Sequence, residues 1–131
     1  MDNFYRENIL DHYRNPRNFS EEKLEYNNEV GNPLCGDRIG MGIKIKASKT
    51  QSFKEENNII EDIHFWGEGC AVSMSSASMF TEFVKGKTTE EAKKIGKEKI
   101  LEFLGIELTP TRLKCALLPL EVFQNTLALV K

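Results

Sequence analysis

Apolar and polar positions alternate with different periods along the chain, and these periods separate expected helices from expected strands. An apolar face recurring at helical spacing predicts a helix over residues 2–13. Asn15 and Pro16 end it, because the residue before a proline is disfavoured in helical conformation. Residues 19–34 are polar and predict mostly loop, with a short strand near Glu29-Val30. The positions that form the helical face are Tyr5, Ile9, His12 and Tyr13.

A strict alternation of apolar and polar side chains follows over residues 39–46 and predicts a strand with one buried face. Residues 58–66 are rich in isoleucine and aromatic residues and predict a second strand, ended by Gly67-Glu68-Gly69. The polar segment 47–57 between them is typical of a hairpin connection. These segments predict a small antiparallel sheet of two or three strands.

The second half of the chain returns to helical spacing. Residues 71–84 predict a helix rich in small residues, and a capping box from Thr88 to Glu91 opens another that we expect to run to Leu104, with Gly96 as a weak point. A last apolar stripe begins near Pro110, and Pro119 is expected to divide it into two helices. The order of elements indicates an α+β fold, a small antiparallel sheet packed by helices, in one domain spanning residues 1–131.

Charge and composition exclude several classes of function. The 18 basic residues against 20 acidic residues give a net charge of −2, which lacks the basic excess of a general nucleic-acid-binding protein. The chain has no apolar run long enough to cross a membrane. Its charged, aromatic N-terminus lacks the apolar region of a secretory signal, so we expect a cytoplasmic protein without membrane association.

The chain has three cysteines, an odd number that cannot pair completely within one molecule. Cys35, Cys70 and Cys115 are spaced 35 and 45 residues apart, so no C-x-x-C motif of a zinc ribbon or thioredoxin type is present. All three lie at expected element boundaries, and glycines flank the first two. They are core residues, metal ligands or reactive thiols.

Asp37 adds a carboxylate two residues after Cys35. If the strand began at Cys35, both side chains would leave the same face of the sheet and could share one ion. Three thiolates and one carboxylate make a plausible four-ligand set for zinc or for an iron–sulfur site. Burial of the three cysteines in the core stays open as the alternative at this point.

Four motifs, in order along nearly the whole chain, resemble the iron–sulfur cluster assembly scaffold family, which includes the IscU, NifU N-terminal and SufU types. The segment 31–37 resembles the N-P-x-C-G-D motif of that family, and the segments around Cys70 and Cys115 are similar to its second and third cysteine motifs. The N-terminal segment 11–18 is similar to the opening of the family. The resemblance implies an IscU/SufU-like fold.

Within this family the chain is nearest to the SufU type. Glu68, Met74 and Lys114 are similar to that branch, whereas IscU-type proteins typically carry histidine before the third cysteine. The short spacing between the second and third cysteines is closer to the IscU type. The subtype therefore stays open between SufU and IscU.

The resemblance implies that Cys35, Asp37, Cys70 and Cys115 surround one surface site that holds zinc, a nascent iron–sulfur cluster, or each in turn. A cysteine desulfurase would deliver sulfur to Cys35, with Cys115 as the alternative acceptor, and iron–sulfur acceptor or carrier proteins would receive the cluster. Lys114 is a candidate auxiliary residue. We expect a monomer, and we place His12 and His64 outside the site.

Two activities are compatible with this site. The first is a scaffold that holds and passes on a cluster. The second is a zinc-dependent sulfurtransferase that accepts persulfide sulfur and stimulates the desulfurase without carrying a cluster, which would make the protein an enzyme. In either case Asp37 is a harder and weaker ligand for iron than a thiolate, and we expect it to make a bound cluster labile.

Overall fold

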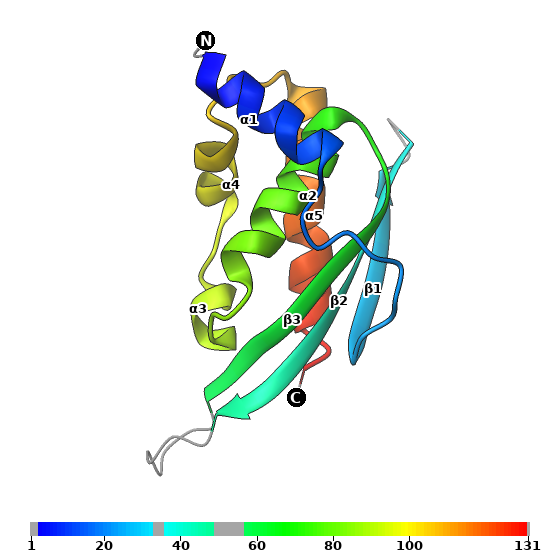
Figure 1. Cartoon of the computed structure of the whole chain (residues 1–131), viewed down its shortest axis with the longest axis vertical. Helices are drawn as coiled ribbons and strands as arrows, with labels where there is room; N and C mark the ends of the chain where they lie inside the picture. The colour runs from blue at the N-terminus through cyan, green and yellow to red at the C-terminus, as the bar shows by residue number, and fades with distance from the viewer. Residues whose placement is uncertain (1–2, 33–35, 49–56, 131) are drawn as a thin grey trace.

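The computed structural model describes residues 3–32, 36–48 and 57–130 (Figure 1). A three-stranded antiparallel sheet in the order β1-β2-β3 carries helices α2 and α5 on one face; α4 packs against both of these helices, and α3 lies against β3 and α5. The elements are α1 (Asn3–Arg14), β1 (Tyr26–Asn32), β2 (Asp37–Ser48), β3 (Asn57–Glu68), α2 (Ala71–Val84), α3 (Thr89–Lys93), α4 (Lys97–Leu104) and α5 (Pro110–Leu127). The expected α+β fold is confirmed.

The alternation in β2 sorts its side chains between the two faces of the sheet. Ile39, Met41 and Ile43 are buried against the helices and Ile45 is partly buried, while Gly40 and Gly42 face the other side. There the ring of Trp66 lies so close to Gly40 that a Cβ at residue 40 would come within 2.2 Å of it. Leu24, in the segment before β1, lies against Gly42. The segment before β1 and Trp66 therefore cover part of the outer face.

Two expectations from the sequence, the length of β1 and a single helix from Thr88 to Leu104, were wrong in detail. Strand β1 is longer than the short strand expected near Glu29, because an edge strand can pair its backbone with β2 without an apolar pattern. The helix expected from Thr88 to Leu104 is two helices, α3 and α4, with Gly96 as the residue that caps α4. The capping box between Thr88 and Glu91 is present as expected.

Pro119 does not divide the last helix. It lies inside the continuous helix α5, between the buried residues Leu118 and Leu120. Proline removes one backbone hydrogen bond from a helix, here the one to the carbonyl of Cys115. Packing of the buried residues on both sides of Pro119 keeps the helix in one piece. In the part of the chain that the structure describes, no helix combines the length and apolar character needed to cross a membrane.

Candidate metal centre

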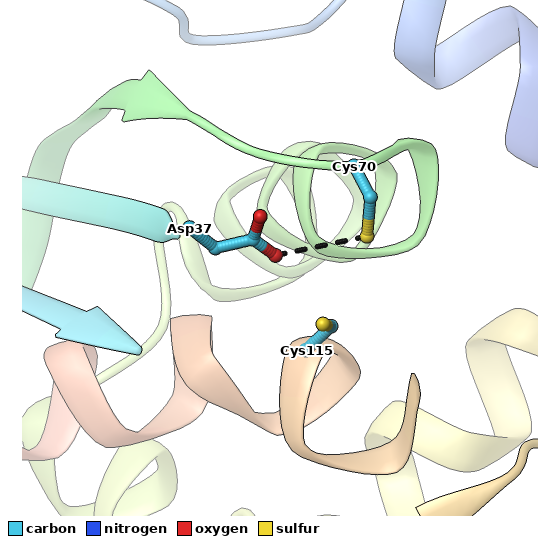
Figure 2. A group of neighbouring side chains, drawn as sticks. All are labelled: Asp37, Cys70 and Cys115. Carbon is cyan, nitrogen blue, oxygen red and sulfur yellow. Dashed lines mark hydrogen bonds between the residues drawn. The ribbon is translucent and has the colours of Figure 1, made fainter. Parts of the chain in front are cut away.

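Three side chains from distant parts of the chain meet at one end of the sheet. Asp37 is the first residue of β2, Cys70 directly precedes α2, and Cys115 lies in the first half of α5. One ligand atom from each, a carboxylate oxygen and the two sulfurs, lie within 4.8 Å of one another (Figure 2). The expected meeting of these three residues is therefore observed. Cys35 lies outside the described residues, as does the expected start of the strand at that residue.

Strand pairing places Asp37 beside the start of α2. Asp37 pairs with the last residue of β1, and the next residue, Arg38, pairs with Glu68 at the end of β3. Gly67 has a φ of 125°, and a Cβ there would come within 1.9 Å of the Arg38 carbonyl oxygen. Glycine at this position lets β3 close against β2, so that the chain enters α2 directly beside the Asp37 carboxylate.

Cys70 is the N-terminal cap residue of α2 and is half-buried. Its thiol donates a hydrogen bond to Oδ2 of Asp37, with a sulfur–oxygen distance of 3.7 Å. The hydroxyl oxygen of Ser73 lies 3.8 Å from the same sulfur and is a second acceptor for the thiol. Because the N-terminus of a helix stabilises nearby negative charge, this position suits a sulfur that binds a cation as thiolate.

Asp37 and Cys115 are more deeply buried than Cys70. Asp37 is 5% exposed and Cys115 is 1% exposed. The side chain of Cys115 points from α5 toward the other two residues (Figure 2). Helix α5 is tied to α2 at this level, because the Ser76 hydroxyl donates a hydrogen bond to the Ala116 carbonyl. This bond links the two helices that carry Cys70 and Cys115 close to the three ligand atoms.

The other candidates from the sequence lie apart from this group. Lys114 is exposed and lines a hollow of about 310 Å³ with Asn32 and Glu121, so its role as an auxiliary residue stays a prediction. His12 is buried and its Nδ1 lies 2.7 Å from the Ser78 hydroxyl, in agreement with a structural role. On the outer face of the sheet, Nε2 of His64 lies 3.5 Å from the Asp62 carboxylate.

The donor set fits a metal with a preference for sulfur. Zinc is bound by thiolate and carboxylate ligands in tetrahedral sites with bonds of about 2.0–2.3 Å. Ligand atoms in such a site are separated by roughly 3.3–3.8 Å, estimated from those bond lengths. The observed spread of 4.8 Å needs a contraction of about 1 Å, which side-chain rotation can supply. The two sulfurs and the carboxylate can therefore hold zinc or ferrous iron together.

Ser73 is the residue at this site that reasoning from the sequence missed. The sequence predicts a helix rich in small residues over 71–84 and gives Ser73 no separate role. The signal was its spacing, since a residue three positions after a helix cap residue folds back over it.

The model of the protein family described as NifU-like N terminal domain matches residues 4–130. The chain belongs to this family. The zinc-dependent sulfurtransferase SufU of Bacillus subtilis is 35% identical over 98% of this chain and 92% of its own length. The iron-sulfur cluster assembly scaffold protein IscU of Haemophilus influenzae is 38% identical over 95% of this chain and 93% of its own.

Solved structures share the fold. FiSufU from Fervidobacterium islandicum superimposes with a TM-score of 0.66 at 24% identity, covering 92% of this chain and 94% of that one. The N-terminal part of a NifU-like protein from Brucella abortus gives a TM-score of 0.70 at 17% identity, covering 97% and 94%. The IscU/SufU-like fold expected from the motifs is confirmed.

Proposed function

We propose that this protein accepts sulfur from a cysteine desulfurase and holds a nascent iron–sulfur cluster for transfer to acceptor or carrier proteins. The observation that carries the proposal is the convergence of the Asp37 carboxylate with the sulfurs of Cys70 and Cys115 within 4.8 Å. Similarity to IscU and SufU proteins over nearly the whole chain supports it. Cys35 is proposed as the fourth ligand on the strength of its motif alone.

Loading the site changes the roles of its side chains. In the metal-free protein the Cys70 thiol donates to Asp37, so the carboxylate oxygen is a hydrogen-bond acceptor. Zinc or iron, when bound, supplies the positive charge that keeps both cysteines as thiolates. With a metal bound, the Cys70 thiol would lose its proton to solvent, and the same Asp37 oxygen would be available as a ligand. Cys115 is already directed inward and needs no change of helix position.

Sulfur delivery requires an accessible thiolate. The acceptor thiolate attacks the terminal sulfur of the desulfurase persulfide, forms a new persulfide, and the desulfurase cysteine leaves as thiolate. Cys115 is 1% exposed and cannot meet a partner protein without movement of α5. This burial supports Cys35 as the proposed acceptor over Cys115. Mass spectrometry of single-cysteine variants after reaction with desulfurase tests the choice, and labelling retained in Cys35→Ser contradicts it.

A second candidate function is that of a zinc-dependent sulfurtransferase. The similarity to the SufU protein of that name covers 98% of this chain, and Lys114 stands where IscU-type proteins carry histidine. In this case zinc would stay bound at the site, and one cysteine would carry the transferred sulfur as a persulfide. The protein would then stimulate the desulfurase without carrying a cluster.

Anaerobic reconstitution with ferrous iron, cysteine and a cysteine desulfurase separates the two functions. A visible chromophore that can be transferred to an apo-acceptor supports the scaffold. Tight zinc binding with stimulated desulfurase turnover and no chromophore supports the sulfurtransferase. Cys70→Ser should abolish either result, whereas the control His64→Gln, outside the site, should leave it unchanged. Absence of both metal binding and desulfurase stimulation contradicts both functions.

The monomeric state and the cytoplasmic location of this protein remain proposals that rest on its sequence.

A further inference from the structure

Ser73 places a buried hydroxyl beside the sulfur of Cys70. The residue is fully buried, and its Oγ lies 3.8 Å from the Cys70 sulfur. The same hydroxyl donates a hydrogen bond of 3.1 Å to the backbone carbonyl of Cys70. It therefore contacts both the backbone and the side chain of one candidate ligand.

The backbone of Gly69 passes close to this hydroxyl. A Cβ on Gly69 would lie 2.2 Å from the Ser73 Oγ and 3.2 Å from Cγ of Asp37. Only a glycine lets the chain pass this close to both side chains. The hydroxyl is thus enclosed between the Gly69 backbone and Cys70, next to the Asp37 carboxyl group, and a small rotation about its C–O bond is the freedom that remains to its hydrogen.

Metal loading reverses the direction in which hydrogen bonds can form at Cys70. A thiol can donate to Ser73 or to Asp37, but a metal-bound thiolate can only accept. The carboxylate of Asp37 has no hydrogen to offer, whereas the Ser73 hydroxyl has one. Turning that hydrogen from the Cys70 carbonyl toward the sulfur supplies the thiolate with a donor.

We propose that Ser73 is a positioning residue that donates a hydrogen bond to the metal-bound sulfur of Cys70 and thereby strengthens metal retention at the site. The inference rests on the proposed function, because it requires that Cys70 binds metal. Partners of metal ligands beyond the first coordination sphere commonly change metal affinity 10- to 100-fold, and hydrogen bonds to sulfur change the electronic properties of the metal–sulfur bond.

Ser75 provides a matched control on the same helix. It is also fully buried, and its hydroxyl donates to the carbonyls of Ala71 and Val72 at 2.5 and 3.3 Å. Ser75→Ala therefore removes a buried hydroxyl-to-carbonyl hydrogen bond from the start of α2, as Ser73→Ala does. Ser75 contacts carbonyl oxygens, whereas Ser73 contacts both a carbonyl oxygen and the Cys70 sulfur.

The test compares wild type, Ser73→Ala, Ser73→Thr and Ser75→Ala in full-length protein. Zinc affinity is measured by competition with a chromophoric chelator, and the sulfur-to-cobalt charge-transfer band is recorded after loading with cobalt(II). We expect Ser73→Ala to bind zinc about 10-fold more weakly. Its band should shift to longer wavelength, because a thiolate without a donor gives up charge more readily. Ser75→Ala should keep the wild-type zinc affinity and the wild-type band position. Ser73→Thr, which retains the hydroxyl, should also show the wild-type affinity and band position.

Three results overturn the inference. An unshifted cobalt band in Ser73→Ala shows that no hydrogen bond reached the sulfur, even if affinity falls. Equal affinity losses in Ser73→Ala and Ser75→Ala show that the serine only supports the helix. If wild-type protein binds neither zinc nor cobalt, the proposed function itself fails and the inference fails with it. The band position is read on the loaded protein, so a moderate loss of stability in one variant does not obscure it.

Discussion

The hydroxyl of Ser76 on α2 donates a hydrogen bond of 2.7 Å to the carbonyl of Ala116 on α5. Both residues are buried, and Ala116 directly follows Cys115. Helix α2 begins directly after Cys70, so this bond links the two helices that position the two sulfurs. The separation of the sulfurs thus depends on a contact that involves neither cysteine.

Ser76→Ala should therefore loosen the site more than the fold. Loss of a buried hydrogen bond of this kind costs about 1 kcal/mol of unfolding free energy, and zinc affinity should fall severalfold because α5 is no longer tied to α2. Denaturant unfolding and chelator competition measure the two effects. Thr126→Val is the control, since Thr126 makes a buried hydroxyl-to-carbonyl bond within α5 to Val122. Equal zinc affinity in Ser76→Ala and wild type would contradict the role given to this bond.

Gly69→Ala should disrupt the metal centre directly. The added methyl group would come within 2.2 Å of the Ser73 hydroxyl and 3.2 Å of Cγ of Asp37, so at least one of these side chains must move. We expect zinc binding at least about 10-fold weaker, which a chelator competition measures. Gly31→Ala is the matched control near the same site, because its nearest neighbour would be the Asp37 carbonyl oxygen at an ordinary 3.7 Å. Wild-type affinity in Gly69→Ala would show that the close approach has no role.

The elements that the sequence predicted well are those whose pattern follows their burial. The alternation in β2 matches its buried face, and α2 has the bounds expected from its small residues and the following Gly86. Strand β1 was underestimated because its side chains are polar and its structure comes from pairing with β2. The break between α3 and α4 was underestimated because Gly96 alone marks it in the sequence, and apolar residues such as Ile100 and Leu104 follow it.

The site shows the same division. Sequence motifs were sufficient to bring Asp37, Cys70 and Cys115 together. Asp37 and Cys70 lie at element boundaries that local signals define, whereas Cys115 lies inside α5. The spacing of Ser73 from the cap residue Cys70 distinguishes it from the other serines of α2, but its contact with the sulfur depends on how closely Gly69 approaches, which the sequence does not show. The burial of Cys115 likewise depends on how α5 packs against α2, and no local sequence pattern predicts this packing.

His12 should make stability depend on pH. Burial, with a further contribution from the charge of Arg17, lowers the pKa of His12 below its ordinary 6.5. The unfolded chain therefore binds a proton more readily than the folded protein, so unfolding free energy falls as the pH drops through about 6.5 and recovers above it. Denaturant unfolding of metal-free protein between pH 5.5 and 7.5, chosen as about one unit either side of that value, measures the slope. His12→Gln should flatten it, and an unchanged slope would contradict the assignment.

Asp37→Cys should lengthen the lifetime of a bound cluster. It replaces the hardest donor of the site with a thiolate, which binds iron more strongly. After anaerobic reconstitution, loss of the visible chromophore to a chelator or an apo-acceptor should be severalfold slower than in wild type. Glu68→Gln, which changes an exposed acidic residue near Cys70, should lose its cluster at the wild-type rate. Faster loss from Asp37→Cys would contradict the view that the carboxylate makes the cluster labile.

Cys70 and Cys115 should differ in their reactivity toward a thiol reagent. Cys70 is half-buried at the start of α2, whereas Cys115 is 1% exposed and becomes accessible only when α5 opens locally. In native, metal-free, reduced protein we expect iodoacetamide to modify Cys70 at least about 10-fold faster than Cys115, a difference governed by thiol exposure. Peptide mass spectrometry over a time course measures both rates, and in denaturant they should converge. Ser76→Ala should raise the rate at Cys115 selectively, because it removes the hydrogen bond between α2 and α5. Equal rates in the native wild-type protein would show that α5 opens readily, and Cys115 would then again be a candidate for direct sulfur transfer.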